Sequence, residues 1–365
     1  MTTRREFLGT TAGALAGIAF VGCDLLAAAP ARAQLRRREV VVSGQRTKVV
    51  DVHAHCAVAE AMALMGMKLG APGPATRPDL SMATHVSERL RAMDEQGIDV
   101  EALSINPYWY KADRDLARQI IKIQNEKLAE ACAAHPDRFV AFATVALQYP
   151  DLAAEQLGEA IKNYGLRGVG IGGSVNGEEL SDPKFHPFWA KAEQLGVPVF
   201  IHPQGSGVAS EIPNRLKGNG LLDNVIGNPL ETTIALSHLI FEGTLDRFPG
   251  LKICAAHGGG YLPSYAARSD HGCLTQPPRC AGGTYGPIKK KPTEYLGQMY
   301  YDTMVFTPEG VRHLAAEVGA DDELARTDLG GEVAVEVVMG TPGLSDADRV
   351  AILGGNAAKL LGIKT

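Results

Sequence analysis

Four histidines follow apolar, strand-like runs in this chain of 365 residues, and their placement predicts metal chemistry. His53 and His55 close the run "VVDVHAH", His202 closes "VPVFIH", and His257 closes "LKICAAH". Alternate residues of a strand point to the same face, so His53 and His55 share a face at the end of their strand. Clustered imidazoles are common ligands of a divalent metal ion. We therefore predict that the histidines meet at one metal site.

A catalytic metal site commonly includes a carboxylate, and two aspartates follow later strand-like runs. Asp302 lies in "MYYDTMVF", and Asp328 lies in "GADDELARTDLGG". Either carboxylate suits the last metal ligand or a general base, because a metal-bound water gives up its proton near neutral pH to a base beside it. The residues alone leave both aspartates open for this role.

The positions of these residues indicate strands that alternate with helices from residue 47 onward. Eight strand-like runs begin near residues 48, 100, 139, 167, 197, 251, 299 and 322. Amphipathic, helix-like segments include 86–97, 113–135, 151–165 and 186–196. The strand-like runs are almost continuously apolar, as in parallel strands covered on both faces. An open doubly wound sheet shows the same alternation, but eight strands with histidines at their ends favour an α/β (β/α)8 TIM barrel.

The first 33 residues have the pattern of an export signal. Arg4 and Arg5 precede an apolar run, and the small-residue sequence "APARA" ends before Gln34. This pattern resembles a twin-arginine signal peptide, with a membrane anchor or a lipoprotein at Cys23 as alternatives. We expect a signal at 1–33, a linker at 34–46 and one barrel domain at 47–365. The expected location is periplasmic or exported, with no stable membrane contact after the signal is removed.

Composition narrows the range of partners. The net charge is −5, and no basic tract is present, which argues against nucleic acid and anionic membrane as partners. Two excursions, 56–84 and 271–297, follow strand ends, and we predict that they wall a pocket at the C-terminal face of the barrel. The second contains Cys273 and Cys280, which could bridge in an oxidising compartment, although spacing alone does not decide this.

Longer segments carry a family resemblance. The chain resembles the amidohydrolase superfamily (amidohydrolase family 2), in its aminocarboxymuconate semialdehyde decarboxylase-like branch. The resemblance covers nearly all of residues 47–365 and includes "DVHAH", "AMDEQGIDVEALS", "GLRGVGIGGSVNG", "GNPLETTIALSHLIFEG" and "RFPGLKICAAHGGGYLPSYAAR". It implies a barrel with one divalent metal, with Zn²⁺ expected and Mn²⁺ as the alternative. It also implies a small-molecule carboxylate as the substrate and a homodimer.

The resemblance assigns roles by position to residues of this sequence. It implies three metal-binding histidines, which are His53, His55 and His202. It implies that His257 acts as the catalytic acid and base. Asp328 matches the last-strand aspartate, as metal ligand and catalytic group, and Asp302 is the reserve for that place. Near Asp328 the stretch "DELARTDLGG" departs from the family's apolar last strand.

Substrate-binding roles follow in the same way. The resemblance implies that Arg268 binds a substrate carboxylate in a neighbouring subunit, as a guanidinium can do through two parallel hydrogen bonds. His271 follows "HGGG" closely, so we predict that it lines the pocket, with a plain helix-end role as the alternative. Arg77 is the nearest candidate for a second substrate arginine. After His202 the chain has "PQG" where the decarboxylase has a Trp, so we expect a different substrate.

Three functions fit these features. The first is a metal-dependent decarboxylase, a carbon–carbon lyase that acts on a small unsaturated or aromatic carboxylic acid. The alternative is a metal-dependent hydrolase of a lactone, ester or amide, because the same metal site can activate water against a carbonyl. The third is a non-catalytic exported protein that binds a metal or another ligand.

Overall fold

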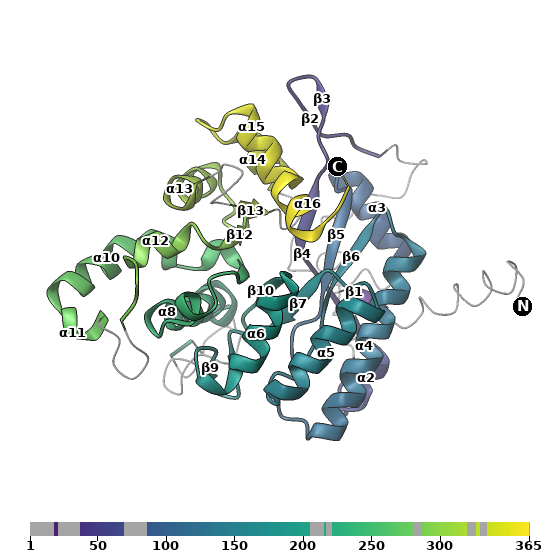
Figure 1. The fold of residues 1–365 in the computed structure, drawn as a ribbon. Coiled ribbons are helices and arrows are strands. Elements are labelled where there is room, and N and C mark those ends of the chain that lie inside the picture. Colours follow the sequence, from purple (N-terminus) through teal and green to yellow (C-terminus); the bar gives the residue numbers. More distant parts are fainter. Residues whose placement is uncertain are drawn as a thin grey trace, which may run out of the picture.

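The protein folds around a sheet of parallel strands (Figure 1). The computed structural model describes residues 18–20, 37–68, 86–204, 215–216, 221–280, 287–319, 326–328 and 334–364. Within these residues the parallel strands are β4 (Val50–Val58), β5 (Val100–Ser104), β6 (Phe139–Ala143), β7 (Gly168–Ile171), β10 (Pro198–Ile201), β11 (Lys252–Ala255), β12 (Tyr300–Asp302) and β13 (Arg326–Asp328). They neighbour one another in chain order, and β13 contacts β4. The predicted eight-stranded TIM barrel is confirmed.

Helices alternate with these strands; most of them lie outside the sheet, while the last helix, α16, packs against the inner cluster at one end of the strands (Figure 1). They are α2 (Ala59–Ala63), α3 (Val86–Gln96), α4 (Arg114–Ala134), α5 (Pro150–Asn163), α6 (His186–Leu195), α8 (Asn228–Phe241), α9 (Thr244–Arg247), α10 (Leu262–Thr275), α11 (Pro277–Cys280), α12 (Pro292–Leu296), α13 (Pro308–Val318), α14 (Ala334–Gly340), α15 (Asp346–Val350) and α16 (Asn356–Leu361). Their ends follow local chemistry. The Asp113 carboxylate accepts a hydrogen bond from the Leu116 amide at the start of α4, and Gly196 ends α6 with a φ of 61°.

Buried apolar side chains form two clusters, one inside the barrel and one between the strands and the surrounding helices. The inner cluster joins side chains of six strands with side chains of α16, namely Val50, Val52, Val100, Ala102, Phe142, Phe200, Cys254, Tyr300, Ala357, Leu360 and Leu361. Phe142 and Phe200 stack within it, with ring centroids 5.4 Å apart. A packed interior of this kind closes one end of the barrel, so a ligand has room only at the opposite end, where the strands finish.

A β-bulge interrupts the pairing of β4 with β5. Asp51 pairs with Glu101, but the next pair is Ala54 with Leu103, so two residues of β4 stand opposite one of β5. A bulge bends a strand and re-aims its side chains. Here Val52, the first residue of the bulge, packs in the inner cluster, while Ala54, the first residue paired after it, packs in the outer cluster.

Segments around the barrel account for further expectations. Within the predicted signal, Ile18–Phe20 form β1, which pairs antiparallel with the end of β4. Cys273 and Cys280, whose pairing the sequence left open, form a disulfide that joins α10 to α11. Two short hairpins, β2 (Val41–Val42) with β3 (Gln45–Arg46) and β8 (Ser174–Val175) with β9 (Glu178–Glu179), complete the strands described.

Among the described residues, no helix combines the length and the apolar character needed to span a membrane.

Candidate metal centre

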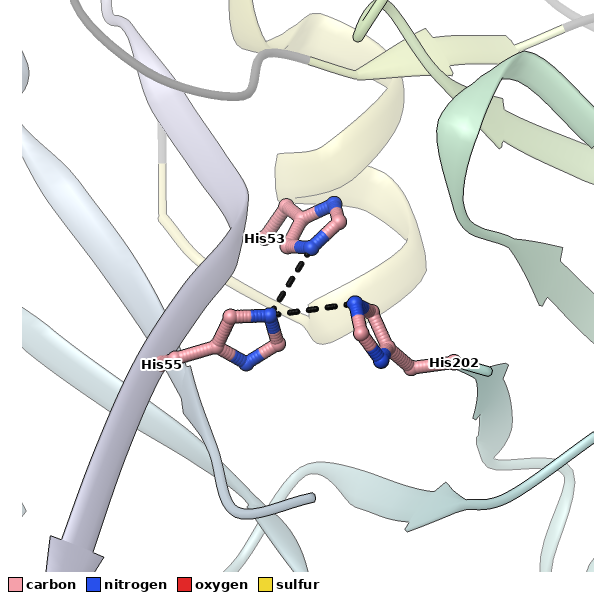
Figure 2. Close-up of side chains that lie close together, drawn as sticks. All are labelled: His53, His55 and His202. Carbon is pink, nitrogen blue, oxygen red and sulfur yellow. Dashed lines mark hydrogen bonds between the residues drawn. The ribbon is translucent and has the colours of Figure 1, made fainter. Parts of the chain in front are cut away.

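Three histidines meet at the carboxyl ends of the strands (Figure 2). His53 and His55 lie on β4, and His202 follows the last residue of β10. The Nε2 atom of His55 lies 2.9 Å from Nε2 of His53 and 3.2 Å from Nε2 of His202. All three residues are at least 95% buried. Within the described part of the chain, they form the group of side chains whose ligand atoms are close enough to share one metal ion.

The outer ring nitrogens decide where the protons lie. His53 Nδ1 donates to the Asp302 carboxylate over 2.6 Å, and His202 Nδ1 donates to the carbonyl of Pro203 over 2.7 Å. A carbonyl or carboxylate only accepts, so both rings carry their proton on Nδ1 and present a lone pair at Nε2. Two lone pairs that face a third ring nitrogen repel one another unless a cation lies between them. The donor set therefore fits a divalent metal ion.

Burial keeps the rings of His55 and His202 neutral, as ligation requires. Burial holds the pKa of His55 well below 6.5, and the neighbouring charge of His53 lowers it further. Burial has the same effect on the pKa of His202, supported by the charges of His55 and His53. A metal binds the unprotonated imidazole, so these shifts leave His55 and His202 able to bind a metal ion at neutral pH.

Asp302, at the end of β12, organises the centre from behind. Its Oδ2 accepts from His53 Nδ1 and from the backbone amide of His257 at 2.9 Å. Its Oδ1 accepts from the amides of Gly258 at 2.8 Å and Met304 at 3.1 Å. Burial raises the pKa of Asp302, but the hydrogen bond and charge of His53 outweigh this, and the net direction is downward. Both oxygens are thus engaged, which makes Asp302 an orienting group for His53 rather than the reserve metal ligand that the sequence suggested.

His257 lies beside the three converging histidines, on a turn with strained backbone. Its ring centroid lies 5.2 Å from that of His53 and 5.1 Å from that of His202. Its φ is 57°, a region that side chains other than glycine rarely adopt, and Gly258 to Gly260 continue with positive φ. A Cβ on Gly260 would lie 2.1 Å from the Pro229 carbonyl oxygen, so this turn needs glycine for space as well as for φ.

The imidazole of His257 is available for chemistry. Its Nδ1 is buried and has no hydrogen-bond partner within the described residues. Burial lowers its pKa to about 4, with a further contribution from His53, while Asp302 opposes the shift. The ring is therefore neutral at pH 7 and has an unpaired nitrogen beside the three converging histidines. Such a group can accept a proton and return it to a bound molecule.

The other predicted site residues lie in different surroundings. Asp328 ends β13, where its backbone is in register with Asp302, and its side chain lies outside what the structure describes, as does all of Arg77. Arg268 is exposed on α10. His271, also exposed, lines a surface cavity between α10, α11 and residues 288–294, and the lining of that cavity includes none of the four site histidines. The structure therefore does not bring His271 to the metal centre of its own chain.

Ser104 is a member of the centre that the sequence interpretation missed. It ends β5, pairs with His55 in the strand register, and places its Oγ 3.1 Å from His55 Nδ1. The sequence did contain a signal for this role, because a serine at the end of an apolar strand can hydrogen-bond the outer nitrogen of a histidine on the neighbouring strand.

Comparisons with known proteins agree with this arrangement. Residues 50–363 match the sequence profile of a family described as Amidohydrolase. A 2-amino-3-carboxymuconate-6-semialdehyde decarboxylase from Dictyostelium discoideum is 32% identical over 75% of this chain and 76% of its own length. A gamma-resorcylate decarboxylase from Rhizobium is also 32% identical, over 74% of this chain and 85% of its own.

A solved structure extends the comparison to three dimensions. The dihydroxybenzoic acid decarboxylase from Polaromonas, solved with bound manganese and the inhibitor 2-nitroresorcinol, superposes with a TM-score of 0.69. It is 27% identical, and the match covers 87% of this chain and 97% of that protein. The similarity therefore spans the whole barrel rather than a single motif.

Proposed function

Because the chain belongs to the amidohydrolase family, we propose that it is a metal-dependent decarboxylase, a carbon–carbon lyase that acts on a small aromatic or unsaturated carboxylic acid. One observation carries the proposal. Three Nε2 atoms converge in a buried centre beside a neutral histidine that has a free ring nitrogen. The relatives named above are decarboxylases, which supports this reaction class over hydrolysis.

The metal site follows from the same geometry. We assign His53, His55 and His202 as ligands, and Asp328, at the end of the next strand after Asp302, as the ligand that completes the set. A bound divalent ion would supply positive charge that stabilises anionic oxygens of the substrate and lowers the pKa of a bound water. Zn²⁺ is the metal we expect, and the manganese of the Polaromonas structure makes Mn²⁺ the second candidate.

His257 would move the proton. Neutral at pH 7, it takes one proton that derives from solvent and delivers it to the substrate carbon that bears the carboxylate. A C–H bond forms, and the bond from that carbon to the carboxylate then breaks. The electron pair of the broken bond stays with the substrate and restores its planar system, while CO₂ departs. The reaction thus consumes one proton and releases one CO₂.

A second copy of the chain would complete substrate binding. Arg268 is exposed on α10 and is free to reach outward, which suits the role of holding the carboxylate of a substrate in a neighbouring subunit. We therefore propose a homodimer, and keep Arg77 as the candidate for a second contact to the substrate. Sedimentation of the purified protein tests the dimer, and an Arg268→Ala variant that raises KM without changing the metal content tests the contact.

The reaction is tested by CO₂ release from a panel of hydroxylated benzoic acids and unsaturated dicarboxylic acids. The metal-loaded protein should release CO₂ from at least one acid, and His257→Ala should abolish this while keeping its metal. His313→Ala is the matched control, because His313 is a partly exposed histidine on α13. If heavy oxygen from water instead enters a product carboxylate of a lactone, ester or amide, the chain is a hydrolase and the proposal fails.

We further propose that the protein is exported by the twin-arginine route. The support is the paired Arg4 and Arg5 before an apolar run and a small-residue cleavage pattern. Cell fractionation should recover the mature chain outside the cytoplasm, and lysine at both arginine positions should retain it inside. An unchanged distribution for that double variant would remove the proposal.

A further inference from the structure

The bulge in β4 includes His53, the first of the proposed metal-binding histidines, and the side chain of Asp51 contacts its backbone. The backbone amide of His53 donates to Oδ1 of Asp51 at 2.8 Å. The pairing of β4 with β5 is interrupted here and resumes only at Ala54 and Leu103. The His53 amide therefore has no place in the strand ladder, and the Asp51 side chain supplies its acceptor. The carboxylate of Asp51 therefore fixes the backbone of the residue that carries the first ligand.

Asp51 is itself held by a buried group of charges behind the sheet. Arg89, on α3, donates from Nε to Oε2 of Glu101 at 2.7 Å, and it lies close enough to Asp51 for that charge to raise the Arg89 pKa. The exposed fractions are 3% for Asp51, 2% for Glu101 and 6% for Arg89. Burying three charges costs free energy unless each charge has a partner. The side chains of Asp51, Glu101 and Arg89 are therefore restricted to positions in which opposite charges lie close together.

The two carboxylates differ in what else they contact. Both face the same guanidinium, and they are paired with each other in the strand register. Asp51 accepts a hydrogen bond from the backbone amide of His53, whereas Glu101 accepts one from the side chain of Arg89. The pair therefore offers a natural comparison, in which the same chemical change can be made with and without the link to His53.

We propose that Asp51 is a positioning residue for the metal centre. The buried charge of Arg89 stabilises the Asp51 carboxylate, and this carboxylate accepts the hydrogen bond of the His53 amide. The bulge is thereby fixed so that the Nε2 atoms of His53 and His55 converge. Without this lock, β4 can regain regular alternation and turn the two rings away from His202. The inference rests on the proposed metal site and adds a determinant outside the ligands and their ring partners.

The test replaces each carboxylate by the amide of the same shape. Asp51→Asn removes the negative charge that stabilises Arg89, and a neutral amide oxygen is a weaker acceptor for the His53 amide than the carboxylate. In Glu101→Gln, the link to His53 is untouched. Metal affinity is measured for both variants by competition with a chelator, and the visible absorption of the cobalt-loaded proteins reports the coordination geometry. Thermal melting separates loss of fold from loss of the centre.

We expect Asp51→Asn to weaken metal binding by about 10- to 100-fold, the range found for groups that orient ligands, and to change the cobalt spectrum. Glu101→Gln should lower the melting temperature but change metal affinity by less than about twofold. Equal losses of affinity in both variants would mean that the charges act only on stability, and unchanged affinity in Asp51→Asn would mean that the lock is dispensable. Either result overturns this inference while the proposed function stands. If the unaltered protein takes up no metal, both fall.

Discussion

The metal-centre wall, made of β4, β10, β11 and β12, differs in construction from the α10–α11 arm, residues 262–280. In the wall, polar groups are buried and paired: Asp302 is fully buried and engages four donors. In the arm, Tyr265 and Leu274 are 62% and 76% exposed, and a disulfide links the helices. A cavity of about 810 Å³ borders the arm.

This difference shows which part of the molecule must hold its side chains in fixed positions. A metal site tolerates little displacement of its ligands, so the wall fixes each ring from behind through buried hydrogen bonds. The arm holds exposed apolar side chains and a covalent link, which suits contact with another molecule more than fixed chemistry. Changes in the wall should therefore act on metal binding, and changes in the arm should leave it intact.

The largest expected effect is the loss of a ligand. His202→Ala removes one of the three converging nitrogens, so the purified variant should carry almost no metal and lose decarboxylation by roughly a thousandfold or more, because a metal ion contributes several kcal/mol of charge stabilisation. Metal analysis and CO₂ release measure the two effects. A variant that keeps a full complement of metal would show that His202 is not a ligand.

Removal of the metal itself should come next. Without an ion, the lone pairs at Nε2 of His53 and His202 face the third ring, so the apoprotein should be less stable than the loaded protein. With free metal at about a thousand times the dissociation constant, linkage predicts a difference of about 4 kcal/mol in the free energy of unfolding. Chelator titration followed by chemical denaturation gives this value. Identical denaturation curves with and without metal would contradict the centre.

We expect the loss of the Asp302 carboxylate to weaken metal binding less than the loss of a ligand, and more than the loss of the Ser104 hydroxyl. Asp302→Asn keeps the shape but supplies one acceptor oxygen where two engage His53, His257, Gly258 and Met304. We expect metal affinity to fall by about 10- to 100-fold. Ser104→Ala, the matched change behind His55, removes one neutral hydrogen bond worth about 1 kcal/mol, or about fivefold. A larger loss for Ser104→Ala would reverse our order of importance.

The smallest effect on the centre is expected from the arm. Replacing Cys273 and Cys280 together by serine removes the link between α10 and α11. Closing a loop of this size stabilises by about 2 kcal/mol, so the arm should become more sensitive to protease. Metal affinity should stay within about twofold of the unaltered protein, as measured by chelator competition. A loss of metal from this double variant would show that the arm supports the wall.

Much of the fold could be predicted from the sequence because its signals are local. Apolar runs of four to nine residues gave the strands, and helix-end residues such as Asp113 and Gly196 lie where helices begin and end. The convergence of His53, His55 and His202 also followed from local rules, since strand ends of a barrel share one rim. The periodic argument held for His53 and His55 because alternation is regular from His53 onward, although His53 itself belongs to the bulge in β4.

The features that the sequence did not predict depend on contacts between segments that are far apart in the chain. The bulge exists only as a mismatch between β4 and β5, so neither strand reveals it alone. Asp302 could be placed near the centre, but only the rotamers of its own side chain and of His53 decide that it binds the outer nitrogen. His271 was misplaced because closeness in sequence to "HGGG" ignored the direction in which α10 leaves the rim.

The most direct test of the central claim is a crystal structure of the metal-loaded protein with anomalous diffraction recorded at the absorption edge of the metal. Our account predicts one strong peak per chain that lies about 2.0–2.1 Å from Nε2 of His53, His55 and His202 if the metal is zinc. A protein that binds metal stoichiometrically but shows no peak among these three nitrogens would contradict it.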